Sequence, residues 1–286
     1  LYGEKIVLRL LNNDASHINI ESLGLTQEEL FRYLEGIKKP HGINLICGPT
    51  GSGKTTTLYA TLKLVNQPGN NILTIEDPIE YTLDGVNQVQ LREDLGLTYT
   101  EALRTFLRQD PDIIMLGEIR DAQTAQMAIR AALTGHLVLS TIHTNSAWGT
   151  VSRLVDMGVA PYLLASVLNL SVAQRLVRCL CSKCKCEENL EMSQLPKRYQ
   201  NFKITKHYVA KGCESCYYTG YSGRKAIYEV INITPQLVEF IKNNVTDIQG
   251  YLREQKIDSL ADNALNLFIN GTTTLEEVYP FLLEIE

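Results

Sequence analysis

The stretch Gly48-Pro49-Thr50-Gly51-Ser52-Gly53-Lys54-Thr55 matches the pattern G-x-x-x-x-G-K-[S/T], in which backbone N–H groups surround a phosphate. An apolar run at residues 43–47 precedes it and predicts a buried strand. After it, Leu58, Leu62 and Val65 fall on one helical face. The glycines permit a tight loop, and the predicted helix directs its positive end at the phosphate. Because strand, loop and helix occur together, an accidental glycine-rich turn is a poor alternative.

Two side chains of this loop have separate tasks. Lys54 can reach the β- and γ-phosphates of a nucleotide, and the Thr55 hydroxyl can bind Mg²⁺. The residues expected to bind nucleotide are Gly48, Pro49, Thr50, Gly51, Ser52, Gly53, Lys54, Thr55 and Thr56. The sequence therefore predicts a phosphate-binding loop for a magnesium–nucleotide complex such as ATP.

Further apolar runs end in polar residues. Residues 71–75 lead into Glu76, residues 113–116 into Gly117-Glu118, and residues 137–142 into His143. Helical patterns separate these runs, which indicates an α/β fold with a mostly parallel sheet covered on both faces. Ligands bind beyond the carboxyl ends of the strands in such sheets. We therefore expect the loop and all three polar positions at one edge.

The expected position of the polar residues beside the phosphate loop suggests a role for each. Glu118 is expected to hold Mg²⁺ through water. Glu76 is the first candidate to activate the attacking water, and Glu80 is the second, since both lie in the segment Glu76-Asp77-Pro78-Ile79-Glu80. His143 could sense the γ-phosphate. His136 lies at the other end of the same predicted strand, roughly 23 Å away at about 3.3 Å per residue, so we expect a structural or subunit-contact role.

The arginines Arg104 and Arg108 share one helical face. They could pair with Asp110 and Asp112, or reach the nucleotide of a neighbouring subunit. The sequence leaves both alternatives open.

Two C-x-x-C knuckles predict a second site. Four thiolates from two such turns suit tetrahedral Zn²⁺ with no open position. The expected ligands are Cys181, Cys184, Cys213 and Cys216. Cys179 and Cys186 flank the first knuckle and could replace a ligand, whereas Cys47 should pack as a small hydrophobe. A nucleic-acid-binding zinc ribbon is the rival interpretation. The segment between the knuckles has basic residues but also Glu187, Glu188 and Glu191, so we expect a solvated surface.

The length of 286 residues allows one large domain and smaller modules. We expect a remnant of a truncated amino-terminal domain at 1–20, a core at 21–178, a cysteine module at 179–226 and a helical subdomain at 227–286. With 44% hydrophobic and 21% charged residues, the composition is that of a soluble globular protein. The most apolar stretch, residues 157–173, contains Pro161 and polar residues, so we expect a buried helix and not a membrane span.

Taken together, the motifs resemble the bacterial type II secretion and type IV pilus assembly ATPases. They are the phosphate loop, residues 76–80, residues 117–121, residues 135–145, Gln174-Arg175-Leu176, the two knuckles and residues 220–224, in this order. The resemblance implies a RecA-like P-loop NTPase core with a small four-cysteine zinc module and a carboxy-terminal helical subdomain. In this family Arg9 matches an arginine that reaches the neighbouring subunit's nucleotide. Residues 261–263 fit the family pattern only loosely.

The resemblance also implies function. We expect an ATP-hydrolysing homohexameric motor at the cytoplasmic face of the inner membrane, which drives assembly of pilin-like subunits through a membrane platform protein. The expected ligands are ATP, Mg²⁺ and Zn²⁺, and no nucleic acid. The alternatives are a RecA-like helicase or packaging motor that uses the zinc module for binding, and a nucleotide-gated scaffold with negligible turnover.

Overall fold

The computed structural model describes residues 3–6, 18–200, 202 and 204–283. Its centre is a seven-stranded sheet in the order β3-β2-β4-β5-β1-β6-β9. The strands of this sheet are β1 (Gly42–Cys47), β2 (Ile72–Glu76), β3 (Asn87–Gln90), β4 (Ile113–Leu116), β5 (Leu137–Ile142), β6 (Leu168–Leu180) and β9 (Tyr221–Asn232). Strands β1 to β6 pair in parallel, and only β9 runs antiparallel, against β6. The predicted α/β fold with a mostly parallel sheet is therefore confirmed.

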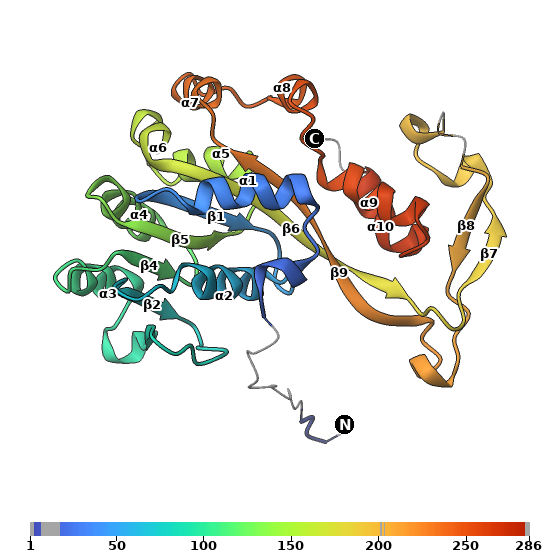
Figure 1. Cartoon of the computed structure of the whole chain (residues 1–286), viewed down its shortest axis with the longest axis horizontal. Coiled ribbons are helices and arrows are strands. Elements are labelled where there is room, and N and C mark those ends of the chain that lie inside the picture. The colour runs from blue at the N-terminus through green and yellow to red at the C-terminus, as the bar shows by residue number, and fades with distance from the viewer. Residues whose placement is uncertain (1–2, 7–17, 201, 203, 284–286) are drawn as a thin grey trace.

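Helices cover both faces of this sheet, as a buried parallel sheet requires (Figure 1). One face packs on α1 (Gln27–Ile37) and α2 (Lys54–Val65). The other packs on α3 (Tyr99–Phe106), α4 (Ala122–Leu133), α5 (Gly149–Asp156) and α6 (Pro161–Val167). Alternate residues of β1 divide between the two cores, with Ile43 and Leu45 in one and Ile46 in the other.

Short 3₁₀ helices complete the described chain. They are η1 (Ile20–Leu23), η2 (Glu93–Leu95), η3 (Met192–Gln194), η4 (Lys197–Tyr199) and η5 (Glu214–Cys216).

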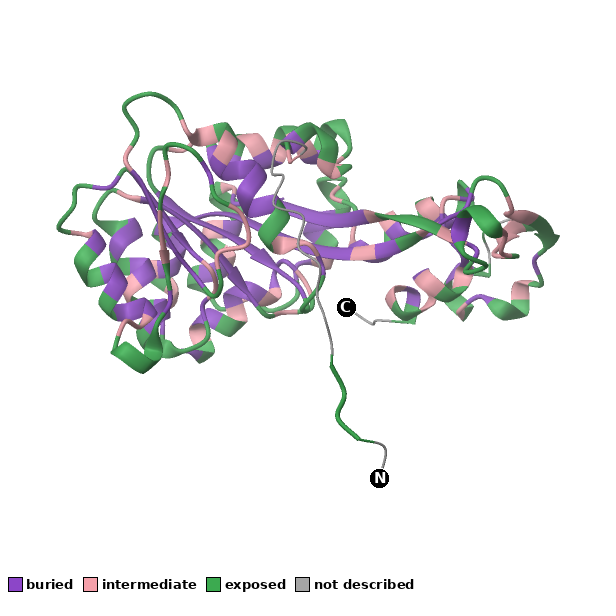
Figure 2. Cartoon of the chain, turned by 90° about the horizontal axis from the view of Figure 1, so that it is seen from below, coloured by how far each residue is buried: buried purple, intermediate pink, exposed green. Residues whose placement is uncertain are grey.

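Strands β6 and β9 form a long ribbon that leaves the sheet and reaches the cysteine module (Figure 1). Their antiparallel pairing runs from Leu170 opposite Asn232 to Leu180 opposite Tyr221. Figure 2 shows the ribbon buried within the core and more exposed toward the module. At its far end lies a two-stranded sheet of β7 (Cys186–Asn189) and β8 (Lys206–Val209). The ribbon is therefore a direct physical link between the core and the module.

The carboxy-terminal helices pack in two places. Helices α7 (Pro235–Lys242) and α8 (Gln249–Glu254) follow β9, and α7 packs on α6. Helices α9 (Leu260–Ile269) and α10 (Leu275–Leu283) lie along the ribbon. Arg178 of β6 fixes α10, since its guanidinium lies 2.7 Å from Glu277 Oε1 and its carbonyl accepts a 2.7 Å bond from Thr273 Oγ1.

The apolar residues 157–173 do not form the single buried helix expected from sequence. Residues 161–167 form α6, and the chain then continues directly as β6. The expectation was wrong because both elements are buried, and an apolar run alone does not separate buried helix from buried strand. No helix in the described parts of the chain is both long enough and apolar enough to cross a membrane.

Candidate nucleotide site and four-cysteine cluster

The phosphate loop has the backbone that its glycines predict. Gly48, Gly51 and Gly53 have φ angles of 149°, 81° and 88°, values that favour glycine. A Cβ on Gly48 would lie 2.4 Å from the Gln174 carbonyl oxygen and 2.7 Å from Ser52 Oγ. The loop therefore folds against β6 more closely than any side chain permits. Gly53 caps α2 without a side-chain bond, which leaves the helix amino-terminal N–H groups available to an anion.

A cavity of about 710 Å³ opens at the carboxyl edge of the sheet. This volume suits a nucleotide-sized ligand. Its lining includes Lys54 and Thr55 of the loop, Glu76 at the carboxyl end of β2, Glu118 after β4 and His143 after β5. Residues from separate segments thus meet at the edge that the strand order dictates. Of the other residues expected to bind nucleotide, Thr50, Gly51, Gly53 and Thr56 also line it.

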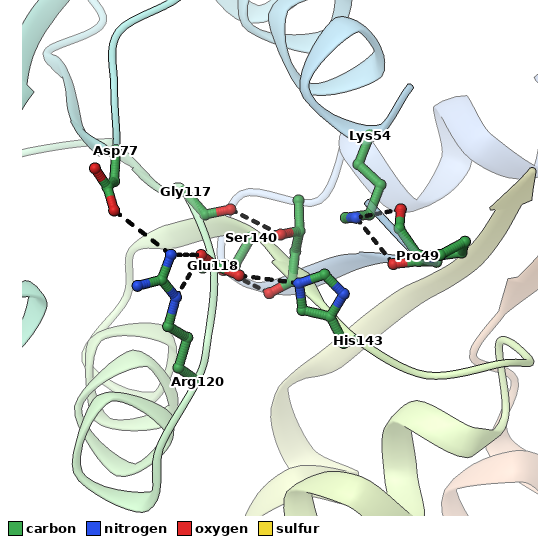
Figure 3. Close-up of polar contacts among 10 residues, drawn as sticks. Pro49, Lys54, Asp77, Gly117, Glu118, Arg120, Ser140 and His143 are labelled. Carbon is green, nitrogen blue, oxygen red and sulfur yellow. Dashed lines mark hydrogen bonds and ion pairs between the residues drawn. The ribbon is translucent and has the colours of Figure 1, made fainter. Parts of the chain in front are cut away.

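Lys54 contacts its own loop. Its Nζ donates to the carbonyl oxygens of Gly48 at 2.9 Å and Pro49 at 3.0 Å (Figure 3). Burial lowers the pKa of Lys54, and the nearby Glu118 opposes part of this shift. The Lys54 ammonium group therefore binds two neutral acceptors of its own loop. A charged phosphate oxygen would be a stronger acceptor than either carbonyl oxygen.

Glu118 is the centre of a charged group in the cavity (Figure 3). Arg120 binds one carboxylate oxygen, and His143 Nε2 lies 3.1 Å from the other. Arg120 also lies 3.5 Å from Asp77. Burial raises the pKa of Glu118, but Arg120 and His143 lower it more, so the pKa lies below its usual value. The carboxylate therefore keeps its charge, as a ligand for a hydrated cation requires.

The two candidate bases have different surroundings. Glu76 is 3% exposed, and its oxygens accept bonds from Tyr59, from Thr74 Oγ1 at 2.6 Å and from Gln88 Nε2 at 3.0 Å. Glu80 lines the same cavity, is half-buried, and has no side-chain hydrogen bond or ion pair within the described residues. Glu76 is thus fixed by its neighbours, whereas the Glu80 carboxyl group is available to a ligand.

Three other candidates, His136, Arg104 and Arg108, do not line the cavity. His136 Nδ1 is 2.9 Å from the Ala131 carbonyl oxygen, at the carboxyl end of α4, so its contact is structural. Arg104 pairs with Glu101 of its own helix, and not with Asp110 or Asp112. Arg108 is exposed. Arg9 lies outside the described residues.

Some lining residues were not predicted from sequence. Tyr99 of α3 and Arg224 of β9 both face the cavity. Arg224 belongs to the motif at residues 220–224, but no spacing rule links that motif to a loop far earlier in the chain. The antiparallel pairing of β9 with β6 brings it there.

The second site lies at the far end of the ribbon. Four cysteine sulfurs lie within 4.8 Å of one another, and they belong to Cys181, Cys184, Cys213 and Cys216. The distance between Sγ atoms is 4.0 Å for Cys181 and Cys213. It is 3.8 Å both for Cys184 and Cys216 and for Cys213 and Cys216. Ligands of a tetrahedral ion with Zn–S bonds of about 2.3 Å stand about 3.8 Å apart. The donor set therefore fits Zn²⁺ in both chemistry and spacing.

The backbone also supports this cluster. Cys216 Sγ accepts from the N–H groups of Cys213 and Gly220, each at 3.2 Å. Such bonds orient a thiolate ligand. Cys179 and Cys186 lie outside the cluster, and Cys186 Sγ contacts the Cys184 carbonyl oxygen at 3.7 Å. Cys47 is fully buried in β1, as its apolar surroundings predict.

Comparison with known proteins gives concordant matches. The sequence profile of the family described as Type II/IV secretion system protein matches residues 1–280. The chain is 46% identical to the putative type II secretion system protein E of Escherichia coli (strain K12), covering 97% of this chain and 57% of that protein. It is 47% identical to the type IV pilus assembly ATPase PilB of Myxococcus xanthus (strain DK1622), covering 97% of this chain and 50% of that protein. The chain thus spans about half the length of these relatives.

Two solved structures of ATPases have a similar fold. The crystal structure of the pilus retraction motor PilT with bound ADP has a TM-score of 0.71 and 29% identity, covering 95% of this chain and 68% of that one. The ATPase DotB of Legionella pneumophila shares the fold, with a TM-score of 0.69 and 24% identity over 92% of this chain and 65% of that one.

Proposed function

Because the chain belongs to the type II/IV secretion system protein family, we propose that it is a magnesium-dependent ATP hydrolase with a RecA-like core. We propose further that it acts as a hexameric motor, which powers assembly of pilin-like subunits in type II secretion or type IV pilus biogenesis. The observation that carries the proposal is the meeting of Lys54, Glu118 and His143 in one cavity at the phosphate loop. The secretion protein and the pilus assembly ATPase among the relatives support the assignment to these systems, and the similar structure of the pilus retraction motor PilT supports a motor.

Each residue of the cavity has a proposed task. The loop amides and Lys54 bind the phosphates, and Lys54 exchanges its carbonyl partners for phosphate oxygens. Thr55 and Glu118 hold Mg²⁺, Glu118 through water. The ion would neutralise charge on the phosphates when bound. His143 is proposed to detect the γ-phosphate, and its contact with Glu118 in the cavity supports this role.

For the base that activates water, the geometry favours Glu80 over Glu76. A base must have a free oxygen within reach of the water. Glu76 already accepts from three side chains and is nearly inaccessible. Glu80 faces the same cavity without a partner among the described side chains. We therefore assign Glu80 as the base and Glu76 as a buried support.

The four-cysteine cluster is proposed as a structural Zn²⁺ site, because all four positions of the tetrahedron have protein ligands. In this view the chain divides into a core at 21–178, a zinc module at 179–226 and a helical subdomain at 227–286. The β6–β9 ribbon joins the core to the module.

The assembly and its setting are proposed from the family. The ring would lie at the cytoplasmic face of the inner membrane and engage a membrane platform protein. An arginine of a neighbouring subunit would complete the site, and Arg9 is the candidate for that role. An arginine finger can contribute about 10³–10⁵-fold to phosphoryl transfer.

A steady-state assay of phosphate release tests this function. We expect magnesium-dependent release by the parent chain and a loss of at least about 100-fold in Glu80→Gln, with binding of a fluorescent ATP analogue retained. Added single-stranded DNA or RNA should leave the rate unchanged. Strong, salt-sensitive stimulation by nucleic acid would instead favour a nucleic-acid motor, and binding without release would favour a nucleotide-gated scaffold.

A further inference from the structure

The Tyr59 hydroxyl connects α2 to the segment that carries Glu80. It donates to Glu76 Oε2 and accepts from the backbone N–H groups of Glu80 at 3.2 Å and Tyr81 at 3.4 Å. A tyrosine hydroxyl has one donor and two acceptor positions, so these bonds use all of them. Tyr59 is 0% exposed, and water therefore does not compete for the contacts. Burial and the Glu76 carboxylate raise the pKa of Tyr59, which keeps its proton available for donation.

Gln88 of β3 makes a second connection, through the other oxygen of the Glu76 carboxylate. Its Nε2 donates to Glu76 Oε1 at 3.0 Å and to the Tyr81 carbonyl oxygen at 2.9 Å. Its Oε1 accepts from the Leu83 N–H at 2.7 Å. Tyr59 and Gln88 thus share the Glu76 carboxylate as a common anchor. Between them they hold backbone groups of residues 80, 81 and 83.

We propose that Tyr59 and Gln88 are positioning residues, which hold Glu80 at the nucleotide cavity by fixing its backbone to the buried Glu76 carboxylate. The proposal rests on the proposed function, in which Glu80 is the base. Tyr59 lies on the helix that begins at Lys54, so the same helix sets both the phosphate contact and the acid. The Tyr81 ring packs edge-on against Tyr59, with centroids 5.6 Å apart, and supports this arrangement.

Tyr59→Phe removes the hydroxyl and keeps the ring. If the hydroxyl positions the base, kcat for ATP hydrolysis should fall about 10- to 100-fold, because a displacement of about 1 Å is costly to catalysis. The KM for ATP should change less than about twofold, since phosphate contacts come from the loop. Gln88→Ala is the second variant. It should lower kcat in the same way and keeps the proposal testable if Tyr59→Phe folds poorly.

Tyr33→Phe is the matched control. Tyr33 of α1 is also buried, and its hydroxyl lies 2.5 Å from Thr61 Oγ1 of α2, the helix that carries Tyr59. Among the described residues, the Tyr33 hydroxyl has no hydrogen bond to residues 77–83. Tyr33→Phe should lose stability as Tyr59→Phe does and leave kcat unchanged. An equal fall in kcat in both variants would mean that general loosening of α2 explains the effect, and would overturn the proposal.

A double-mutant cycle with Glu80→Gln separates positioning from an independent role. If Tyr59 acts through Glu80, the double variant should be no slower than Glu80→Gln alone. Additive losses would overturn the positioning role while leaving Glu80 as the base. Full turnover in Glu80→Gln would instead overturn the assignment of Glu80 as the base, whereas no hydrolysis by the parent chain would overturn the proposed function.

Hydrogen exchange provides a readout that needs no hydrolysis. Tyr59→Phe removes the acceptor of the Glu80 and Tyr81 amides, so mass spectrometry should detect faster exchange across residues 77–83. Tyr33→Phe should leave exchange there unchanged. Unchanged exchange in Tyr59→Phe would show that the hydroxyl does not hold this segment and would overturn the proposal, whatever the outcome for ATP hydrolysis.

Discussion

His143 Nε2 lies 3.1 Å from Glu118 Oε2, so the residues that follow β5 and β4 meet across adjacent parallel strands. Arg120 binds the other carboxylate oxygen of Glu118. The acid proposed to support Mg²⁺ is thereby tied to the histidine proposed to detect the γ-phosphate. Any change in charge at one of these residues acts on the other.

The first prediction concerns the pKa of Glu118. Burial raises this pKa, but Arg120 and His143 lower it further, to below the usual 4.5. A carboxyl group with a lowered folded-state pKa contributes stability above its unfolded pKa, and that contribution is lost as pH falls through the folded value. We expect Arg120→Gln to raise the pKa of Glu118, as measured by carbon NMR titration of labelled glutamate. An unchanged pKa would contradict the ion pair.

The second prediction separates Glu76 from Glu80 by stability. Glu76→Gln replaces an acceptor with an amide donor beside Tyr59, Thr74 and Gln88, so a buried polar group loses its partner. We expect the free energy of unfolding to fall by about 1–3 kcal/mol in urea titrations. Glu80→Gln should change it by less than about 0.5 kcal/mol, because that side chain is free at a cavity. The reverse order would contradict the assignment of support and base.

The third prediction concerns the cysteine cluster. Metal analysis should find one Zn²⁺ per chain, and Cys181→Ser should lose it, because metal binding and local folding are coupled. Cys186→Ser is the matched control, since Cys186 lies next to the knuckle but outside the cluster. Chelation should increase proteolysis of residues 181–220 and leave ATP binding at the distant loop intact. Zinc loss in Cys186→Ser, with zinc kept in Cys181→Ser, would mean that the ligand set is wrong.

The fourth prediction compares two loop glycines. Gly48→Ala places a Cβ 2.4 Å from the Gln174 carbonyl oxygen, whereas a Cβ on Gly51 meets no atom within 4 Å. Both have positive φ, so Gly51→Ala should cost about 1 kcal/mol, and Gly48→Ala should cost more because of the added clash. Thermal unfolding of the two variants measures the difference. Equal melting temperatures would argue against the close approach of loop and β6.

Sequence alone predicted the parts of the fold that have local signals. The apolar run before Gly48 and the glycine pattern sufficed for β1, the loop and α2, because each signal lies within a few residues of its element. The cysteine cluster was predicted because the knuckle spacing encodes its ligand geometry. Both results depend on short-range patterns.

Contacts between residues far apart in the sequence could not be predicted from such short-range patterns. Residues 168–173 of β6 were predicted as part of a buried helix, because an apolar run alone does not separate a buried strand from a buried helix. Nothing in the local sequence marks Tyr59 as a partner of Glu76, because the hydrogen bond joins a helix to a strand end. The burial of Glu76, and hence the preference for Glu80, follows only from that tertiary packing.

The central claim is that this phosphate loop supports hydrolysis of ATP, and the most direct measurement is steady-state phosphate release by the parent chain and by Lys54→Ala. The Lys54 side chain acts on phosphate charge, and its Nζ donates to two carbonyl oxygens of its own loop, so the fold of Lys54→Ala should persist by circular dichroism. We predict magnesium-dependent release by the parent and a loss of at least about 100-fold in the variant. Release by Lys54→Ala at the parent rate would contradict the account.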